Sequence, residues 1–149
     1  MFNPNSGFMQ GRYNSGEWSK NFDPIAPSYL GSGEFTEGTV IYADHQSAGK
    51  GQPGNRWESE KGKNLLFSVI LCPQSVSPED QFLISMSLSL GICDFLDNHI
   101  REAKIKWPND ILARGKKIAG ILIEASPDHG AAVVGIGLNV NWREIPEHT

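Results

Sequence analysis

Four short β-prone runs joined by tight turns fill the last third of this 149-residue sequence, and they constrain its fold more than any other feature. The runs span residues 104–107, 111–113, 117–124 and 132–140. Arg114-Gly115-Lys116 is a short hairpin link, and Pro127-Asp128-His129-Gly130 is a cluster of turn residues. Because such short links join antiparallel neighbours, we expect an antiparallel run of strands here.

Two strands and a helix precede this run. Thr39–Ala43 is β-rich, and Leu65–Leu71 is nearly all apolar, as expected for a central strand covered on both faces. Ser77-Pro78-Glu79-Asp80 combines a cap residue, a proline and first-turn acids, which predicts a helix from there to about Asn98. Strands, one helix and more strands indicate the α+β class.

The predicted helix is apolar on two sides. One stripe contains Phe82, Leu83, Met86, Leu90, Cys93 and Leu96, and the other contains Ile84, Leu88, Ile92 and Phe95. A helix of this kind is expected to be buried between layers. Cys93 is then expected to fill the core rather than to act as a nucleophile.

Residues 1–36 differ from the rest of the chain. Gly, Pro, Ser and Asn supply 17 of these 36 residues, and Ile25 and Leu30 are the only Leu, Ile or Val. We predict an irregular, low-apolar leader, followed by one domain over residues 37–149. Its aromatic residues are candidate anchors onto the domain or a partner: Phe2, Phe8, Tyr13, Trp18, Phe22, Tyr29 and Phe35.

Composition excludes several classes of protein. The formal net charge of −4 argues against a general DNA binder, and no apolar run is long enough to cross a membrane. Cys72 and Cys93 lack metal-ligand spacing, and the sequence begins without a secretory signal, so we expect a cytoplasmic protein. Residues 101–117 nevertheless carry a local charge of +4, which fits either a small anionic ligand or a solvated strand edge.

A glycine-punctuated loop follows the first strand. It contains Gln46, Gly49, Lys50, Gly51 and Gln52, and it ends at Trp57. Closely spaced glycines let backbone N–H groups approach a phosphate or carboxylate. The loop leads into another strand rather than a helix, so it is not a dinucleotide-binding loop of the Rossmann type. From the residues alone, an anion-binding loop and a plain surface loop remain open.

Two further motifs complete the candidate site. In Lys106-Trp107-Pro108-Asn109-Asp110 a proline ends a strand, and the hairpin brings Lys117 and Gly120 back towards it. Two lysines and a carboxylate at one end of a sheet suit a phosphate chain with its Mg²⁺. In Val134-Gly135-Ile136-Gly137-Leu138-Asn139 the glycines inside a strand indicate a bulge, a ligand or another close neighbour.

In this order and spacing the motifs closely resemble the catalytic domain of biotin protein ligases, over about residues 38–141. The resemblance implies a mixed, largely antiparallel sheet with packing helices, as in class II aminoacyl-tRNA synthetases. It also implies ATP-dependent attachment of biotin to a lysine of a biotin-carrier domain, through biotinyl-5′-AMP. ATP, biotin and Mg²⁺ would be the ligands, the carrier domain the partner, and a homodimer is compatible with the class.

The same resemblance assigns roles to individual residues. Lys117 meets the biotin carboxylate and the α-phosphate, and Asp110 serves the nucleotide, its magnesium or the incoming amine. The other implied biotin- and adenylate-binding residues are Gln46, Gly49, Lys50, Gly51, Gln52, Trp57, Lys106, Asn109, Gly120 and Asn139. No residue is assigned to the metal.

The sequence departs from the family pattern at three places. Residues 1–36 contain no Ser-Thr-Asn, the chain stops eight residues after Asn141, and the loop carries Lys50 and Gln52 where many members have Arg. Three alternatives therefore stay open: a truncated homologue that binds without ligating, a lipoate or octanoyl ligase or transferase, and a scaffold with an interaction segment. Nothing in residues 1–36 has the apolar periodicity of a DNA-binding helix-turn-helix.

Overall fold

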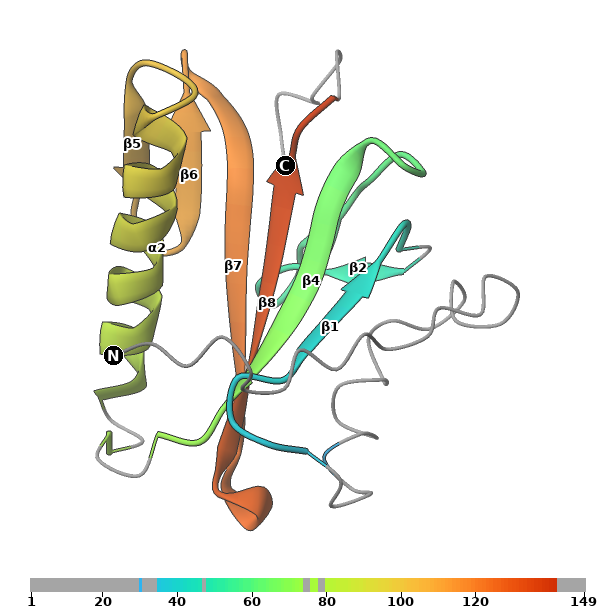
Figure 1. The fold of residues 1–149 in the computed structure, drawn as a ribbon, viewed down its shortest axis with the longest axis vertical. Coiled ribbons are helices and arrows are strands. Elements are labelled where there is room, and N and C mark those ends of the chain that lie inside the picture. Colours follow the sequence, from blue (N-terminus) through green and yellow to red (C-terminus); the bar gives the residue numbers. More distant parts are fainter. Residues whose placement is uncertain (1–29, 31–34, 47, 74–75, 78–79, 142–149) are drawn as a thin grey trace, which may run out of the picture.

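The computed structural model describes residues 30, 35–46, 48–73, 76–77 and 80–141, and its main feature is a six-stranded sheet (Figure 1). The strand order is β1-β4-β8-β7-β6-β5, and every neighbouring pair is antiparallel. The strands are β1 (Val40–Ala43), β4 (Asn64–Leu71), β5 (Ala103–Lys106), β6 (Asp110–Ala113), β7 (Lys116–Ser126) and β8 (Ala131–Asn139). The predicted α+β class and the antiparallel run are confirmed.

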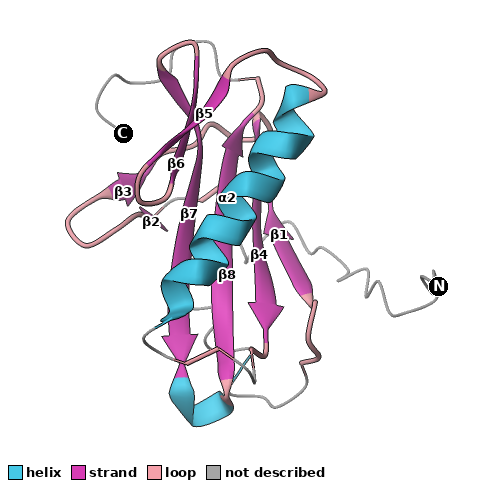
Figure 2. Cartoon of the chain, turned by 90° about the vertical axis from the view of Figure 1, so that its left-hand side faces the viewer, coloured by secondary structure: helices cyan, strands magenta, loops and turns pink. Residues whose placement is uncertain are grey.

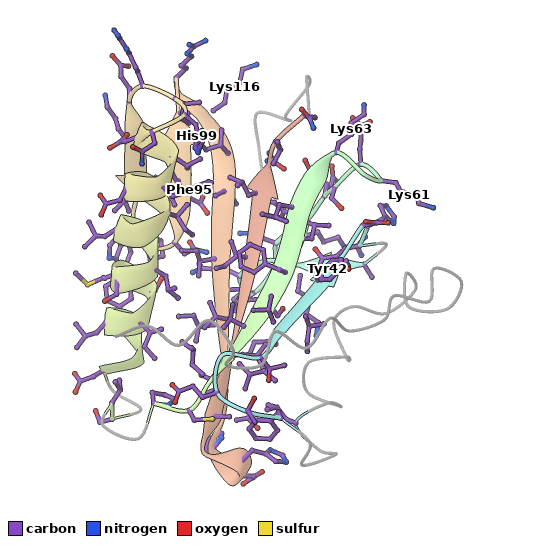
Figure 3. The ribbon with its side chains drawn as sticks, in the orientation of Figure 1. Tyr42, Lys61, Lys63, Phe95, His99 and Lys116 are labelled. Carbon is purple, nitrogen blue, oxygen red and sulfur yellow. The ribbon has the colours of Figure 1, made fainter. Side chains whose placement is uncertain are left out.

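Helix α2 (Gln81–Asp97) runs across one face of this sheet (Figure 2). Its buried side carries Ser85, Ser89, Cys93 and Leu96, which face strands β5, β6 and β7. The other side stays exposed: Leu90 has 57% of its surface accessible, and Phe95 lies near His99 on that helix (Figure 3). The prediction that the helix is buried between two layers is therefore wrong, because within the described residues only the sheet covers it.

The start of the helix also differs from the prediction. Helix α2 begins at Gln81 after Asp80, and Ser77 Oγ donates a hydrogen bond to Asp80 Oδ2 at 2.9 Å. Ser77 therefore does not cap a helix that starts at Pro78, although residues 78 and 79 themselves lie outside the described residues. The helix ends at Asp97, one residue before the predicted end.

Strand β4 occupies the predicted interior position between β1 and β8. Leu66, Ser68 and Ile70 are buried on one face, whereas Leu65 on the other face is about half exposed. The expectation that both faces of this strand are covered is wrong at Leu65, because helix α2 packs on β5, β6 and β7 at the opposite side of the sheet.

The predicted turns are confirmed. Arg114 and Gly115 join β6 to β7 with φ angles of 51° and 76°, the left-handed pair that a two-residue hairpin needs. The 3₁₀ helix η3 (Pro127–His129) joins β7 to β8 and ends at Gly130, whose φ is 59°. Because these links are short, the strands on either side keep a fixed register.

The glycine-rich loop contains a small hairpin that the sequence did not indicate. Strand β2 (Gly49–Lys50) pairs with β3 (Arg56–Trp57), and the two form a separate sheet. A Cβ at Gly49 would lie 2.5 Å from the carbonyl oxygen of Trp57, so only glycine allows this close pairing. The hairpin carries Trp57 to the face of the main sheet opposite helix α2.

Most of the predicted leader lies outside the described residues, including the anchors Phe2, Phe8, Tyr13, Trp18, Phe22 and Tyr29. Leu30 is fully buried in a cluster with Ile70, Ala131 and Val133, and Phe35 packs against that cluster. No helix among the described residues is long and apolar enough to cross a membrane.

Candidate functional site

One row of residues crosses four strands of the sheet. Lys106 of β5 pairs with Asp110 of β6, Asp110 with Gly120 of β7, and Gly120 with Gly137 of β8. Residues directly opposite each other in a ladder project to the same face. The lysine and the carboxylate therefore stand beside two positions without side chains.

A β-bulge brings Lys117 to the same face. The register between β6 and β7 shifts between Ile111 and Leu112, so that Ala119 pairs with Ile111 but Lys117 pairs with Leu112. Side chains alternate along a regular strand, and Lys117 and Gly120, three apart, would otherwise point to opposite faces. The extra residue in β7 reverses this alternation and turns Lys117 towards Asp110.

The two lysines and the carboxylate form one charged cluster. Lys117 Nζ lies 3.0 Å from Asp110 Oδ1, and Lys106 Nζ lies 3.8 Å from Asp110 Oδ2. Lys117 and Asp110 keep only 18% and 14% of their side chains accessible, so water screens this pair weakly, whereas Lys106 is exposed. The cluster has a net positive charge, as the sequence predicted for an anion site.

Trp57 covers the two glycines of the row. A Cβ at Gly120 would lie 2.9 Å from Trp57 Cζ3, and a Cβ at Gly137 would overlap the indole ring. Lys117 Nζ is 5.4 Å from the centre of the same ring, which suits a cation–π contact. The glycines inside β7 and β8 therefore serve to admit an aromatic side chain.

A cavity of about 710 Å³ lies between the β2–β3 hairpin and the sheet. Ten of the twelve predicted site residues line it: Gln46, Lys50, Gly51, Gln52, Trp57, Lys106, Asn109, Asp110, Lys117 and Gly120. Its size is in the range of pockets that hold small molecules. The fold thus brings together three motifs that are far apart in the sequence.

The other two predicted residues lie next to the cavity rather than in its wall. Gly49 is buried against Trp57 in the β2–β3 hairpin. Asn139, at the end of β8, donates a hydrogen bond from Nδ2 to the carbonyl oxygen of Lys117 at 3.3 Å. Both residues hold the side chains of lining residues in place.

Asn109 ties the turn after β5 to β7. Its Nδ2 donates to the carbonyl oxygen of Ile121 at 2.8 Å, and the Ile121 N–H donates to the Asn109 carbonyl at 3.0 Å. This double contact fixes the position of the neighbouring Asp110. The side-chain oxygen of Asn109 is the part of the amide that remains for a ligand.

Sequence reasoning missed some lining residues. Ser68 is buried on β4 beneath the cavity, and Trp107, Gly135 and Gly137 also line it. A single serine in the apolar run 65–71 was the signal for the first of these. No group of three or more His, Cys, Asp or Glu side chains among the described residues could hold a metal ion by itself. A metal would therefore need ligands from a substrate.

Comparisons with known proteins agree with this geometry. The sequence profile of the biotin/lipoate A/B protein ligase family matches residues 19–141. The chain is 36% identical over 118 residues to the bifunctional ligase/repressor BirA of Bacillus subtilis, which covers 75% of this chain and 35% of that protein. It is also 36% identical over 126 residues to the biotin–[acetyl-CoA-carboxylase] ligase of Mycobacterium tuberculosis, which covers 82% and 46%.

A solved structure gives the same result. The biotin protein ligase from Aquifex aeolicus in complex with biotin and ATP superposes with a TM-score of 0.68 at 36% identity, over 80% of this chain and 50% of that one. The chain thus spans about a third to a half of the length of the relatives it matches. The sequence profile match, the identity to these ligases and the shared fold agree, and the chain belongs to the biotin/lipoate A/B protein ligase family.

Proposed function

We propose that this protein attaches biotin to a lysine of a biotin-carrier domain, at the expense of ATP and through biotinyl-5′-AMP. The observation that carries the proposal is the weakly screened Lys117–Asp110 pair beside a cavity roofed by Trp57. Support comes from relatives that are named biotin ligases and from a solved relative that holds biotin and ATP. The same names favour biotin over lipoate or an octanoyl chain.

In the first step the biotin carboxylate attacks the α-phosphorus of ATP, and the bond to the bridging oxygen of pyrophosphate breaks. Two anions must approach each other, and negative charge grows on the phosphoryl oxygens. Lys117 neutralises this charge, and Asp110 fixes its ammonium group before the reaction starts. Lys50 and Lys106 line the same cavity and add positive charge along the phosphate chain.

In the second step the carrier lysine attacks the activated carbonyl carbon, AMP leaves, and the amine loses a proton. Asp110 Oδ2 lies 3.8 Å from exposed Lys106, so it is the oxygen of this carboxylate nearer to solvent-exposed groups. We assign it the task of orienting the incoming ammonium group. The carrier domain binds where the cavity opens, and a homodimer stays a prediction.

Magnesium fits the site as a companion of the nucleotide. Mg²⁺ is usually bound by one or two carboxylates together with substrate phosphates, and Asp110 is the carboxylate next to both lysines. When bound, the ion supplies charge neutralisation on the phosphates. We place the reaction in the cytoplasm, since Cys72 and Cys93 are both free thiols, as a reducing compartment keeps them.

The test is biotin-dependent release of pyrophosphate from ATP by the purified chain, with mass spectrometry for biotinyl-AMP. Transfer to a carrier domain is then measured as a mass increase of one biotin. Lipoate and octanoate replace biotin in parallel reactions. Biotinyl-AMP and carrier labelling support the proposal.

Two other results would separate the alternatives. A folded chain that binds biotin and ATP without releasing pyrophosphate would identify a binding-only homologue. Pyrophosphate release with lipoate or octanoate but not with biotin would place the chain in the other branch of the family.

A further inference from the structure

A group of buried polar atoms lies at the upper end of the site face without hydrogen-bond partners. Among the described residues these atoms are Trp57 Nε1, both side-chain amide atoms of Asn64, and Asn139 Oδ1. Asn64 was not among the residues that the sequence singled out. Buried polar atoms in proteins are nearly always paired, so a group of unpaired ones needs an explanation.

The sheet register places these side chains together. Asn64 of β4 is directly opposite Asn139 of β8, so their side chains project to the same face about 5 Å apart at Cβ. The next pair on that face is Leu66 and Gly137, and the Trp57 indole lies over Gly137. The three polar groups therefore share one end of the face that carries Lys117 and Asp110.

Asn139 also links this group to the charged cluster. Because its Nδ2 donates to the carbonyl oxygen of Lys117, the orientation of the amide is fixed and Oδ1 can only accept. A ligand group at Oδ1 must therefore be a donor. Asn64 has both a free donor and a free acceptor at the neighbouring position.

We infer that Asn64 reads the purine base of the nucleotide. This inference rests on the proposed use of ATP. Adenine presents an amino donor next to a ring-nitrogen acceptor, and an asparagine amide can bind such a pair with both of its atoms. The Asn139 oxygen accepts from the amino group, and Asn64 Nδ2 donates to the ring nitrogen. A 6-oxopurine has the opposite pattern, so it meets the fixed Asn139 oxygen with its own carbonyl.

The structure also offers a rival explanation. Asn64 and Asn139 face each other, and a small rotation would pair Asn64 Nδ2 with Asn139 Oδ1 as a purely structural amide contact. That role would affect stability but not the choice of base. The experiment must therefore compare two nucleotides.

The test measures biotin-dependent pyrophosphate release with ATP and with ITP, whose base is a 6-oxopurine. We expect Asn64→Ala to raise the KM for ATP about tenfold or more, to leave the KM for biotin within about twofold, and to reduce the preference for ATP over ITP. Asn64→Asp, which keeps the size and the acceptor but loses the donor, is expected to do the same. Asn98→Ala, at the exposed end of α2, is the matched control and should change none of these values.

A lowered melting temperature with an unchanged ATP/ITP ratio would overturn the inference in favour of the structural contact. If Asn64→Ala does not fold, NMR of the wild type decides. The side-chain amide signal of Asn64, assigned with Asn64→Asp, should shift on addition of ATP and not of biotin; a signal that does not move would contradict the inference.

Failure of this inference differs from failure of the proposed function. Titration with ATP alone needs no turnover, so a shifted Asn64 signal in a chain that makes no biotinyl-AMP would contradict only the ligase activity. An active ligase whose Asn64 variants keep their nucleotide preference would contradict only the inference. A chain that does not bind ATP would contradict both.

Discussion

Lys117 Nζ lies 3.0 Å from Asp110 Oδ1, although the two residues are seven positions apart on different strands. The β-bulge at Ile111 and Leu112 makes this contact, because it reverses the alternation of β7 just before Gly120. The pair is mostly buried, and Lys106 approaches it from the exposed side. Charge, geometry and partial exclusion of water thus coincide at one point of the cavity.

Replacing Lys117 should remove adenylate formation without unfolding the chain. We expect Lys117→Ala to lower the rate of biotin-dependent pyrophosphate release by about 10² to 10³, the usual effect of losing one fixed group that stabilises transition-state charge. Lys117→Arg keeps the charge and serves as the control. Circular dichroism of each variant checks the fold. Wild-type rates in Lys117→Ala, or loss of the folded state, would show that the assignment is wrong.

The contact between Gly137 and Trp57 should not tolerate even one methyl group. A Cβ at Gly137 would overlap the indole, so Gly137→Ala should displace Trp57 and shift its indole N–H signal in NMR spectra. Trp57→Phe assigns that signal. At Gly135 the nearest atom to a Cβ is 3.6 Å away, so Gly135→Ala should leave the signal in place. Equal shifts in both variants would contradict the proposed packing.

Two serines on the buried side of α2 should respond oppositely to removal of their hydroxyl groups. Ser89 is 1% exposed, and its Oγ has no partner among the described residues, so Ser89→Ala should stabilise the chain by about 1 kcal/mol. Ser85 Oγ donates a long hydrogen bond of 3.5 Å to the Pro108 carbonyl, so Ser85→Ala should gain less or lose stability. Urea unfolding measures both. A more stable Ser85→Ala than Ser89→Ala would refute this account.

The Cys93 thiol should be a poor nucleophile at neutral pH. Burial, and then the negative charges of Asp97 and Asp94, raise the pKa of Cys93 above that of an ordinary thiol. Iodoacetamide should therefore label Cys72, which is half-buried, before Cys93. Mass spectrometry of peptides at successive times gives both rates. Faster labelling of Cys93 would exclude the predicted role of core filler.

The same raised pKa predicts how stability depends on pH. Above the ordinary thiol pKa of about 8.5, Cys93 ionises in the unfolded chain but stays protonated in the folded one, so its contribution is complete below that value and is lost as pH rises. The wild type should lose more unfolding free energy between pH 8 and 10 than Cys93→Ala. Asp97→Asn should reduce this loss, because it removes one of the charges that raise the pKa.

Local patterns in the sequence determined most of the secondary structure. The four late strands, the Arg114-Gly115 turn and the interior place of β4 follow from side-chain alternation, turn residues and apolar runs, which depend only on near neighbours. The start of α2 was missed because Ser77 bonds to Asp80 instead of capping a helix at Pro78. The small β2–β3 hairpin was missed because its pairing depends on a close backbone approach at Gly49.

The sequence by itself also determined which residues line the cavity, because the three motifs carry the charges and glycines that an anion site needs. Only the tertiary structure decided how they meet. The bulge that turns Lys117, the seat of Trp57 over Gly120 and Gly137, and the pairing of Asn64 with Asn139 are relations between strands. Register across a sheet is fixed by contacts between distant segments, and no local pattern contains that information.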